Sequence, residues 1–167
     1  LVKTEFSLYL DVDTVPDKDM INILLENTKK IKNFSMLTPK VQNFNYGEDL
    51  YIEHNKNKKY HKMKFVTGCA LLFNMESLNE TGFFDENIFI YFEPWDLSKR
   101  ISLAGKKMYV CEKIKFEHLG GQSHEPRFNF EATLSRNWHY CWSKFYYIRK
   151  YSNYFYAIKK TFSILVK

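Results

Sequence analysis

The strongest constraint on the fold is a short apolar run that ends at two carboxylates. Residues 6–10 (FSLYL) are rich in strand-forming side chains and stop at Asp11-Val12-Asp13. This pattern predicts a buried strand with acids at its carboxyl end, followed by a turn at residues 14–16. Open α/β sheets bind their ligands just beyond the carboxyl ends of strands, so the two acids are candidate functional residues.

A helical pattern follows directly. Residues 17–32 carry acids at the start and lysines at the end, which suits the helix dipole. The same segment has an apolar face made of Met20, Ile23, Leu24 and Ile31. Alternation of strand and helix patterns places the chain in the α/β class.

Further segments continue the alternation. We expect strands at 35–41 (broken at Pro39), 64–74, 107–111 and 113–117, and helical segments at 76–80 (closed by Gly82), 95–104 (capped by Gly105) and 136–167. Residues 43–62 lack periodicity and predict an exposed polar excursion in which His54 and His61 are solvated. Residues 83–92 predict an aromatic-rich loop.

Composition narrows the class of protein. The net charge of +6 favours anionic partners. Three cysteines without a CxxC pair or zinc-type spacing indicate a reducing compartment. We find no signal-peptide pattern, and no apolar run reaches the ~18 residues of a transmembrane helix. The chain starts within a strand-like segment, which suggests missing upstream sequence.

Asp11 and Asp13 have the chemistry of a hard-cation site. Two carboxylates one residue apart can share one Mg²⁺ or Mn²⁺, which prefers oxygen ligands and is completed by substrate phosphates. Such a cation neutralises a leaving diphosphate. An Asp-x-Asp alone is a weak signal, because a solvated turn is the more common reason for this pattern.

The wider pattern resembles family 2 glycosyltransferases of the GT-A type, in particular their bacterial rhamnosyl-, galactosyl- and galactofuranosyltransferase branches. The resemblance covers about residues 6–123. It rests on residues 8–16 (LYLDVDTVP), 66–72 (VTGCALL), 82–86 (GFFDE), 91–97 (YFEPWDL), Arg100, Ala104-Gly105 and 118–123 (HLGGQS).

The resemblance implies a Rossmann-like GT-A sheet that lacks its N-terminal strands, and a sugar transferred from a nucleotide-diphosphate donor with inversion. It implies Asp11, Asp13 and His118 as metal ligands and Gly68 as part of the substrate-binding floor. His124 is a weaker candidate.

One position departs from the family pattern. The residue expected to be the catalytic Asp is Pro94, which cannot accept a proton, so Glu93 and Asp96 remain as candidate bases. Glu93 could instead support Arg100, and Asp96 could simply favour the start of its helix. A catalytically degenerate relative that still binds nucleotide or glycan is the first alternative.

Two aromatic features add to the expected site. The Trp95 ring is either a platform for an acceptor sugar or part of the core. Residues 136–167 hold seven Lys or Arg, no Asp or Glu, and many aromatic rings, which predicts a basic helix at a membrane interface or a helix packed on the domain.

The resemblance implies a partial GT-A catalytic domain at 1–130, and the residue pattern predicts a helical tail at 131–167 that associates with a membrane or packs on the domain. The expected protein is a metal-dependent glycosyltransferase of cell-surface polysaccharide synthesis. It would be cytoplasmic at the inner membrane face and would use a nucleotide-sugar donor and a saccharide or lipid-linked acceptor. A peripheral membrane or nucleic-acid-binding module is the second alternative, although no nucleic-acid recognition motif is present.

Overall fold

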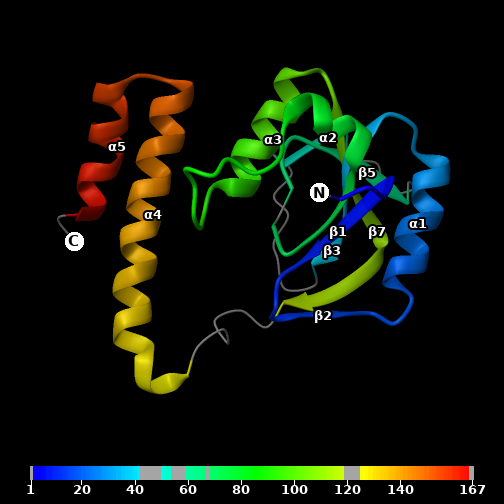
Figure 1. Ribbon diagram of the computed structural model, residues 1–167, viewed down its shortest axis with the longest axis horizontal. Helices are drawn as coiled ribbons and strands as arrows, with labels where there is room; N and C mark the ends of the chain where they lie inside the picture. Colours follow the sequence, from blue (N-terminus) through cyan, green and yellow to red (C-terminus); the bar gives the residue numbers. More distant parts are fainter. Residues whose placement is uncertain (1, 42–49, 54–58, 67, 119–124, 166–167) are drawn as a thin grey trace. The chain divides into compact units, whose positions relative to one another are not determined.

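The computed structural model describes residues 2–41, 50–53, 59–66, 68–118 and 125–165 (Figure 1). The side chains at 113, 115, 117, 118, 163 and 165 lie outside this description. The chain divides into two compact units, which are treated separately below. The first comprises Leu1–Phe83 and Leu97–Ser123, and the second comprises Phe84–Asp96 and His124–Lys167.

A mixed sheet forms the centre of the first unit. Its strands are β1 (Phe6–Leu10), β2 (Thr14–Pro16), β3 (Phe34–Val41), β4 (Tyr51–Glu53), β5 (Tyr60–Met63), β6 (Ala70–Asn74) and β7 (Lys107–His118). Their order is β1-β6-β3-β7-β5-β4, and β2 also pairs with β7. Among the described strands only β3 and β7 pair in parallel. Helices α1 (Met20–Lys30), α2 (Met75–Thr81) and α3 (Glu93–Leu103) accompany the sheet, which confirms the α/β class.

Helix α1 covers the sheet with the face that the sequence predicts. Met20, Leu24 and Ile31 are buried and join a hydrophobic cluster with residues of β3 and β7, such as Leu37 and Phe116. The helix begins later than residue 17 because the Asp17 carboxylate accepts the N–H of Asp19 and so forms a local turn instead.

The predicted turn at residues 14–16 is wrong. These residues form β2, and the turn lies one step earlier, where the N–H of Thr14 donates to the Asp11 carbonyl at 3.1 Å. Pro16 is compatible with a strand here because β2 pairs only with β7, along one of its edges.

The predicted breaks at Pro39 and at residue 112 are also wrong, because both strands continue through an irregularity. The β3–β7 register jumps from Pro39↔Cys111 to Lys40↔Lys115. A bulge of this kind absorbs a proline in an interior strand and leaves β7 as one strand of 12 residues.

The expected polar excursion at 43–62 contains two strands, β4 and β5. His61 was expected to be solvated, yet its side chain is only 1% exposed and lies edge-on to Tyr51, with Nε2 3.7 Å from the Glu112 carboxylate. Met63, two residues further along, is also buried. The strand therefore has the alternation of buried and less buried side chains that is typical of strands, but one of its buried positions is a histidine, a residue type that a sequence pattern counts as polar. His54 lies outside the described residues.

Two glycine-terminated helices are confirmed. Helix α2 ends at Gly82, whose φ of 76° is a conformation that glycine adopts readily. Helix α3 is followed by Gly105 at φ 71°, as the sequence predicts. By contrast, the predicted strand at 64–74 is regular only over β6.

The second unit is dominated by two helices that lie side by side (Figure 1, orange and red). The expected single stretch from residue 136 is instead α4 (Asn129–Tyr151) and α5 (Tyr154–Leu165), preceded by a short 3₁₀ turn, Pro126–Phe128. Ser152 leaves the helical conformation, and the Asn153 side chain then accepts the N–H of Tyr156 at the start of α5. None of the helices in the described part of the chain is long and apolar enough to cross a membrane.

Adjacent leucines on α1 test the packing of this helix. Leu24 is 1% exposed and Leu25 is 40% exposed. We expect Leu24→Ala to lower the free energy of unfolding by about 2–5 kcal/mol, because it leaves a cavity between α1 and the sheet. Leu25→Ala is the matched control and should cost less than about 1 kcal/mol. Urea denaturation measures both, and equal effects would contradict the assigned face of α1.

Candidate functional site

The two acids of the Asp-x-Asp motif lie in the first unit beside the glycine-containing segment. Strands β1 and β6 are antiparallel, and Leu10 pairs with Ala70. Just beyond this pair, the Asp11 N–H and the Thr14 hydroxyl donate to the Cys69 carbonyl at 3.0 and 3.1 Å. The turn that carries both acids is therefore held against the residue next to Gly68.

A third segment reaches the same turn through β2 and β7. Thr14, directly after Asp13, is the pairing partner of His118 at the end of β7. The backbone of His118 thus lies across from the acidic turn. The His118 side chain and all of His124 lie outside the described residues, and so do Gly120 and Gly121.

The electrostatics of this turn are visible at the Cys69 thiol. Burial, and then the charges of Asp11 and Asp13, raise the pKa of this thiol to about 11. Both carboxylates therefore lie close enough to the Cys69 thiol to disfavour its charged form. The Tyr9 hydroxyl donates to the Asp11 carboxylate at 2.6 Å, which orients that group. All three cysteines are free thiols.

Divalent cations of the Mg²⁺ type need few protein ligands. A group of three or more His, Cys, Asp or Glu side chains suited to a metal is not found among the side chains that the structure describes. Asp11 and Asp13 are partly exposed, so their oxygens are accessible to a cation whose other ligands are water or phosphate. The donor set of two carboxylates fits Mg²⁺ or Mn²⁺ and does not fit a softer metal.

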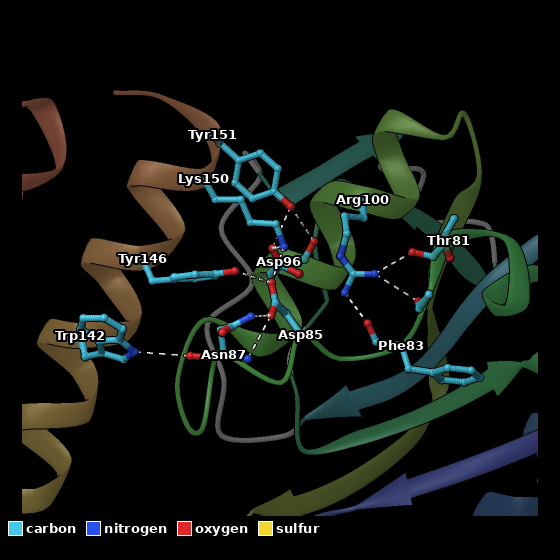
Figure 2. Close-up of polar contacts among 11 residues, drawn as sticks. Thr81, Phe83, Asp85, Asn87, Asp96, Arg100, Trp142, Tyr146, Lys150 and Tyr151 are labelled. Carbon is cyan, nitrogen blue, oxygen red and sulfur yellow. Dashed lines mark hydrogen bonds and ion pairs between the residues drawn. The ribbon is translucent and has the colours of Figure 1, made fainter. Parts of the chain in front are cut away.

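In the second unit, a buried charge cluster joins α4 to the segment that leads into α3 (Figure 2). The Lys150 ammonium lies 2.6 Å from an Asp85 carboxylate oxygen and 2.7 Å from an Asp96 carboxylate oxygen. The Asp96 side chain is 0% exposed and that of Asp85 is 13% exposed. One cation thus compensates two acids that would be costly to bury alone.

Hydrogen bonds complete this charge cluster. Tyr151 donates to Asp96 at 2.8 Å and Tyr146 donates to Asp85 at 3.0 Å (Figure 2). Burial alone would raise the pKa of the Asp85 carboxyl, but hydrogen bonds from Lys150, Asn87 and Tyr146 hold that pKa well below its usual range. Burial likewise opposes the charge of Lys150, yet the two acids raise its pKa above the ordinary value.

The two candidate bases occupy different environments. Asp96 has no exposed surface, forms an ion pair with Lys150 and accepts a hydrogen bond from Tyr151, so its carboxylate is occupied in holding α4. Glu93 is the first residue of α3; the residue as a whole is partly exposed, but its Oε2 atom is buried. Pro94 follows it in the first turn, where a helix needs no N–H donor and accommodates proline well.

The Trp95 side chain is partly packed and partly exposed. Its ring packs against Phe92 and Tyr147, with centroids 5.9 and 6.5 Å apart, yet the residue remains 46% exposed. The ring is therefore supported by neighbours over part of its surface and exposed over the rest.

Arg100 holds the start of the aromatic-rich loop, at Phe83 in the first unit. Its guanidinium donates to the carbonyls of Thr81 and Gly82 at 2.7 and 3.1 Å, and also to that of Phe83 (Figure 2). These carbonyls end helix α2, where acceptors lack helical partners. Arg100 thus fixes the backbone where the loop begins.

Sequence reasoning missed the role of Lys150, Tyr146 and Tyr151. All three lie in the segment for which the sequence predicts either a helix at a membrane interface or a helix packed on the domain, and it names no partner for them. The sequence feature that could have indicated this role is the spacing, since Tyr146 and Lys150 are four residues apart and share one helical face. Their partner Asp85 is distant in sequence, so that spacing alone could not identify what the face contacts.

The predicted site residues fall into two groups. Asp11, Asp13, Gly68 and the backbone of His118 come together in the first unit. Glu93, Trp95 and Asp96 lie together at the start of α3 in the second unit. No protein-family model matches the chain, and no curated protein matches it.

Removing the shared cation tests the charge cluster. We expect Lys150→Met to lower the free energy of unfolding by about 3–5 kcal/mol, because Asp96 loses its ammonium partner in a buried position. Arg149→Met, at the neighbouring exposed position, is the control and should change stability by less than about 0.5 kcal/mol. Adding Asp96→Asn to Lys150→Met should recover stability, and no recovery would mean that charge burial is not the cause.

Proposed function

We propose that this chain is a metal-dependent glycosyltransferase of the GT-A type, acting on a nucleotide-diphosphate sugar and a saccharide or lipid-linked acceptor. The observation that carries the proposal is the convergence of three sequence segments at one turn. The β1–β6 and β2–β7 pairings bring Asp11–Asp13, the Gly68 segment and the backbone of His118 together. These are the segments in which the sequence resembles the donor-metal site of family 2 enzymes.

The chemistry that we propose is a direct displacement. Asp11 and Asp13, with His118 as a further ligand, would hold Mn²⁺ or Mg²⁺, which supplies positive charge to the leaving diphosphate. The acceptor hydroxyl oxygen forms a bond to the anomeric carbon as the bond from that carbon to the diphosphate breaks. The electron pair leaves with the diphosphate, and the hydroxyl proton passes to a carboxylate base.

Glu93 is our choice for that base. A general base must reach the proton that it removes, and Asp96 has no exposed surface and is bonded to Lys150 and Tyr151. Glu93 lies at the start of the same helix, next to the half-exposed ring of Trp95; its Oε2 atom is buried, while the residue as a whole is partly exposed. Asp96 is then a positioning residue that ties this helix start to α4.

The experiment that tests the proposal is a Mn²⁺ titration of the chain with and without a nucleoside diphosphate. We expect the nucleotide to enhance Mn²⁺ binding, and Asp11→Ala/Asp13→Ala to abolish that enhancement, because these two acids would hold the cation that neutralises the diphosphate. Glu93→Gln should leave this binding intact and remove sugar transfer from a panel of nucleotide-sugar donors.

Asp17→Ala/Asp19→Ala is the matched control, since these exposed acids lie close by in sequence but outside the turn. Nucleotide-dependent Mn²⁺ binding that survives in the Asp11→Ala/Asp13→Ala variant would refute the proposed donor site. Intact binding with no transfer from any donor, even in the unaltered chain, would favour the degenerate nucleotide-binding relative.

We further propose that helices α4 and α5 associate with an anionic membrane surface. From residue 132 onward the chain has no Asp or Glu. Large side chains on these helices remain well exposed, among them Trp138 at 66%, Phe155 at 83% and Phe162 at 62%. Exposed rings with basic neighbours suit the headgroup region of anionic lipid.

Vesicle co-sedimentation tests this second proposal. We expect binding to phosphatidylglycerol-containing vesicles and not to pure phosphatidylcholine vesicles, with loss in high salt. Trp138→Ala/Phe155→Ala/Phe162→Ala should reduce the bound fraction several-fold. Leu103→Ala, which removes a 67% exposed side chain from α3, is the control. Equal binding by the triple variant and the control would refute the role of α4 and α5.

A further inference from the structure

An aromatic pocket in the second unit has no role in the proposed donor site. It encloses about 410 Å³ and is lined by Tyr91, Phe92 and Trp95 near the start of α3, and by Tyr140 and Lys144 on α4. This volume falls within the range of roughly 300–1,000 Å³ typical of small-molecule sites. Four aromatic rings and one cation therefore surround a space large enough for a sugar ring.

The pocket is built on strained backbone. Tyr91 and Phe92 have φ values of 64° and 67°, a left-handed conformation that is unfavourable for residues other than glycine. The strain turns both rings onto α4, where the Tyr140 ring lies 5.7 Å from Tyr91 and 5.5 Å from Phe92. Such strain persists only where surrounding contacts hold it, and it is concentrated at functional sites.

Two hydrogen bonds supply those surrounding contacts. Ser143, which is fully buried on α4, donates to the Ile90 carbonyl at 2.7 Å, one residue before the strained pair. On the other side, the Phe92 carbonyl accepts the first helical N–H bond of α3, from Asp96, at 2.8 Å. The backbone that carries the pocket is therefore fixed at both ends, and the walls are in place before any ligand binds.

Lys144 is the charged group of this pocket. Its ammonium lies 5.6 Å from the centroid of the Tyr140 ring. It forms no ion pair with any carboxylate in the part of the chain that the structure describes. Lys150, six residues further along α4, is by contrast bound to two acids. The positive charge of Lys144 is thus available to a ligand.

We propose that this pocket binds a saccharide that carries a negative charge, such as a uronic acid or a phosphorylated sugar. Aromatic faces pack against the apolar C–H face of a sugar ring, and Trp95 and Tyr140 supply exposed rings of this kind. The Lys144 ammonium selects the anionic group by a charge-assisted hydrogen bond. The assignment of this saccharide as the transfer acceptor rests on the proposed glycosyltransferase function, whereas its binding to the pocket does not.

The indole N–H signals of the three tryptophans provide a direct assay. We expect methyl β-D-glucuronide to shift the Trp95 signal, identified by its loss in Trp95→Phe, and to leave the Trp138 and Trp142 signals in place. Methyl β-D-glucoside should bind more weakly because it lacks the charge. Glucose 6-phosphate tests whether phosphate replaces carboxylate. No metal or nucleotide-sugar donor is present in these titrations.

Two lysine variants isolate the contribution of charge. Lys144→Gln should weaken glucuronide binding roughly tenfold and leave glucoside binding unchanged. Lys160→Gln is the matched control, because the Lys160 ammonium lies 5.4 Å from the Tyr156 ring on α5 but lines no part of this pocket. Equal affinity for glucuronide and glucoside, or equal effects of the two variants, would overturn the proposed selection of an anion.

Two other results would overturn the pocket itself. One is a Trp95 signal that no saccharide shifts, and the other is a larger shift with a nucleoside diphosphate than with any saccharide. The Asp11→Ala/Asp13→Ala variant should bind glucuronide as the unaltered chain does. Failure of saccharide binding is therefore distinguishable from failure of the donor site, which that variant alone disrupts.

Discussion

Strand β7 is the element on which the first unit depends. It pairs with β3 on one side and β5 on the other, and its final residues extend far enough to pair with β2. Because β2 follows the Asp11–Asp13 turn directly, the length of β7 determines where the two acids lie. The bulge opposite Pro39 and Lys40 is part of this arrangement, since it lets one strand remain continuous past a proline in the sheet interior.

The second unit depends on a different kind of interaction, the compensation of buried charge. Lys150 bonds Asp85 in the aromatic loop and Asp96 in the first turn of α3, so one side chain on α4 fixes both ends of the loop. A buried ion cluster adds little net stability compared with apolar packing, but it allows only one arrangement of its partners. The strained conformation of Tyr91 and Phe92 lies between these two acids and is consistent with a segment held at both ends.

Several elements could be predicted because their signals are local. The strand at Phe6–Leu10, the apolar face of α1, and the glycines that end α2 and α3 all follow from periodicity or from a conformation that glycine favours. The failures share a different cause. Pro39 in an interior strand, His61 as a core side chain and Asp96 as a buried ion partner each depend on residues distant in the sequence.

By itself, the sequence determined the α/β class, the two carboxylates at a strand end and the basic, aromatic character of the last two helices. These are properties of residue type and spacing, which act over a few neighbouring positions. Only the tertiary structure decided that Asp96 is enclosed while Trp95 stays accessible, that Lys150 is bonded while Lys144 is available, and that four aromatic rings surround one pocket. Burial and charge pairing depend on which distant segments meet, and no local pattern of residues contains that information.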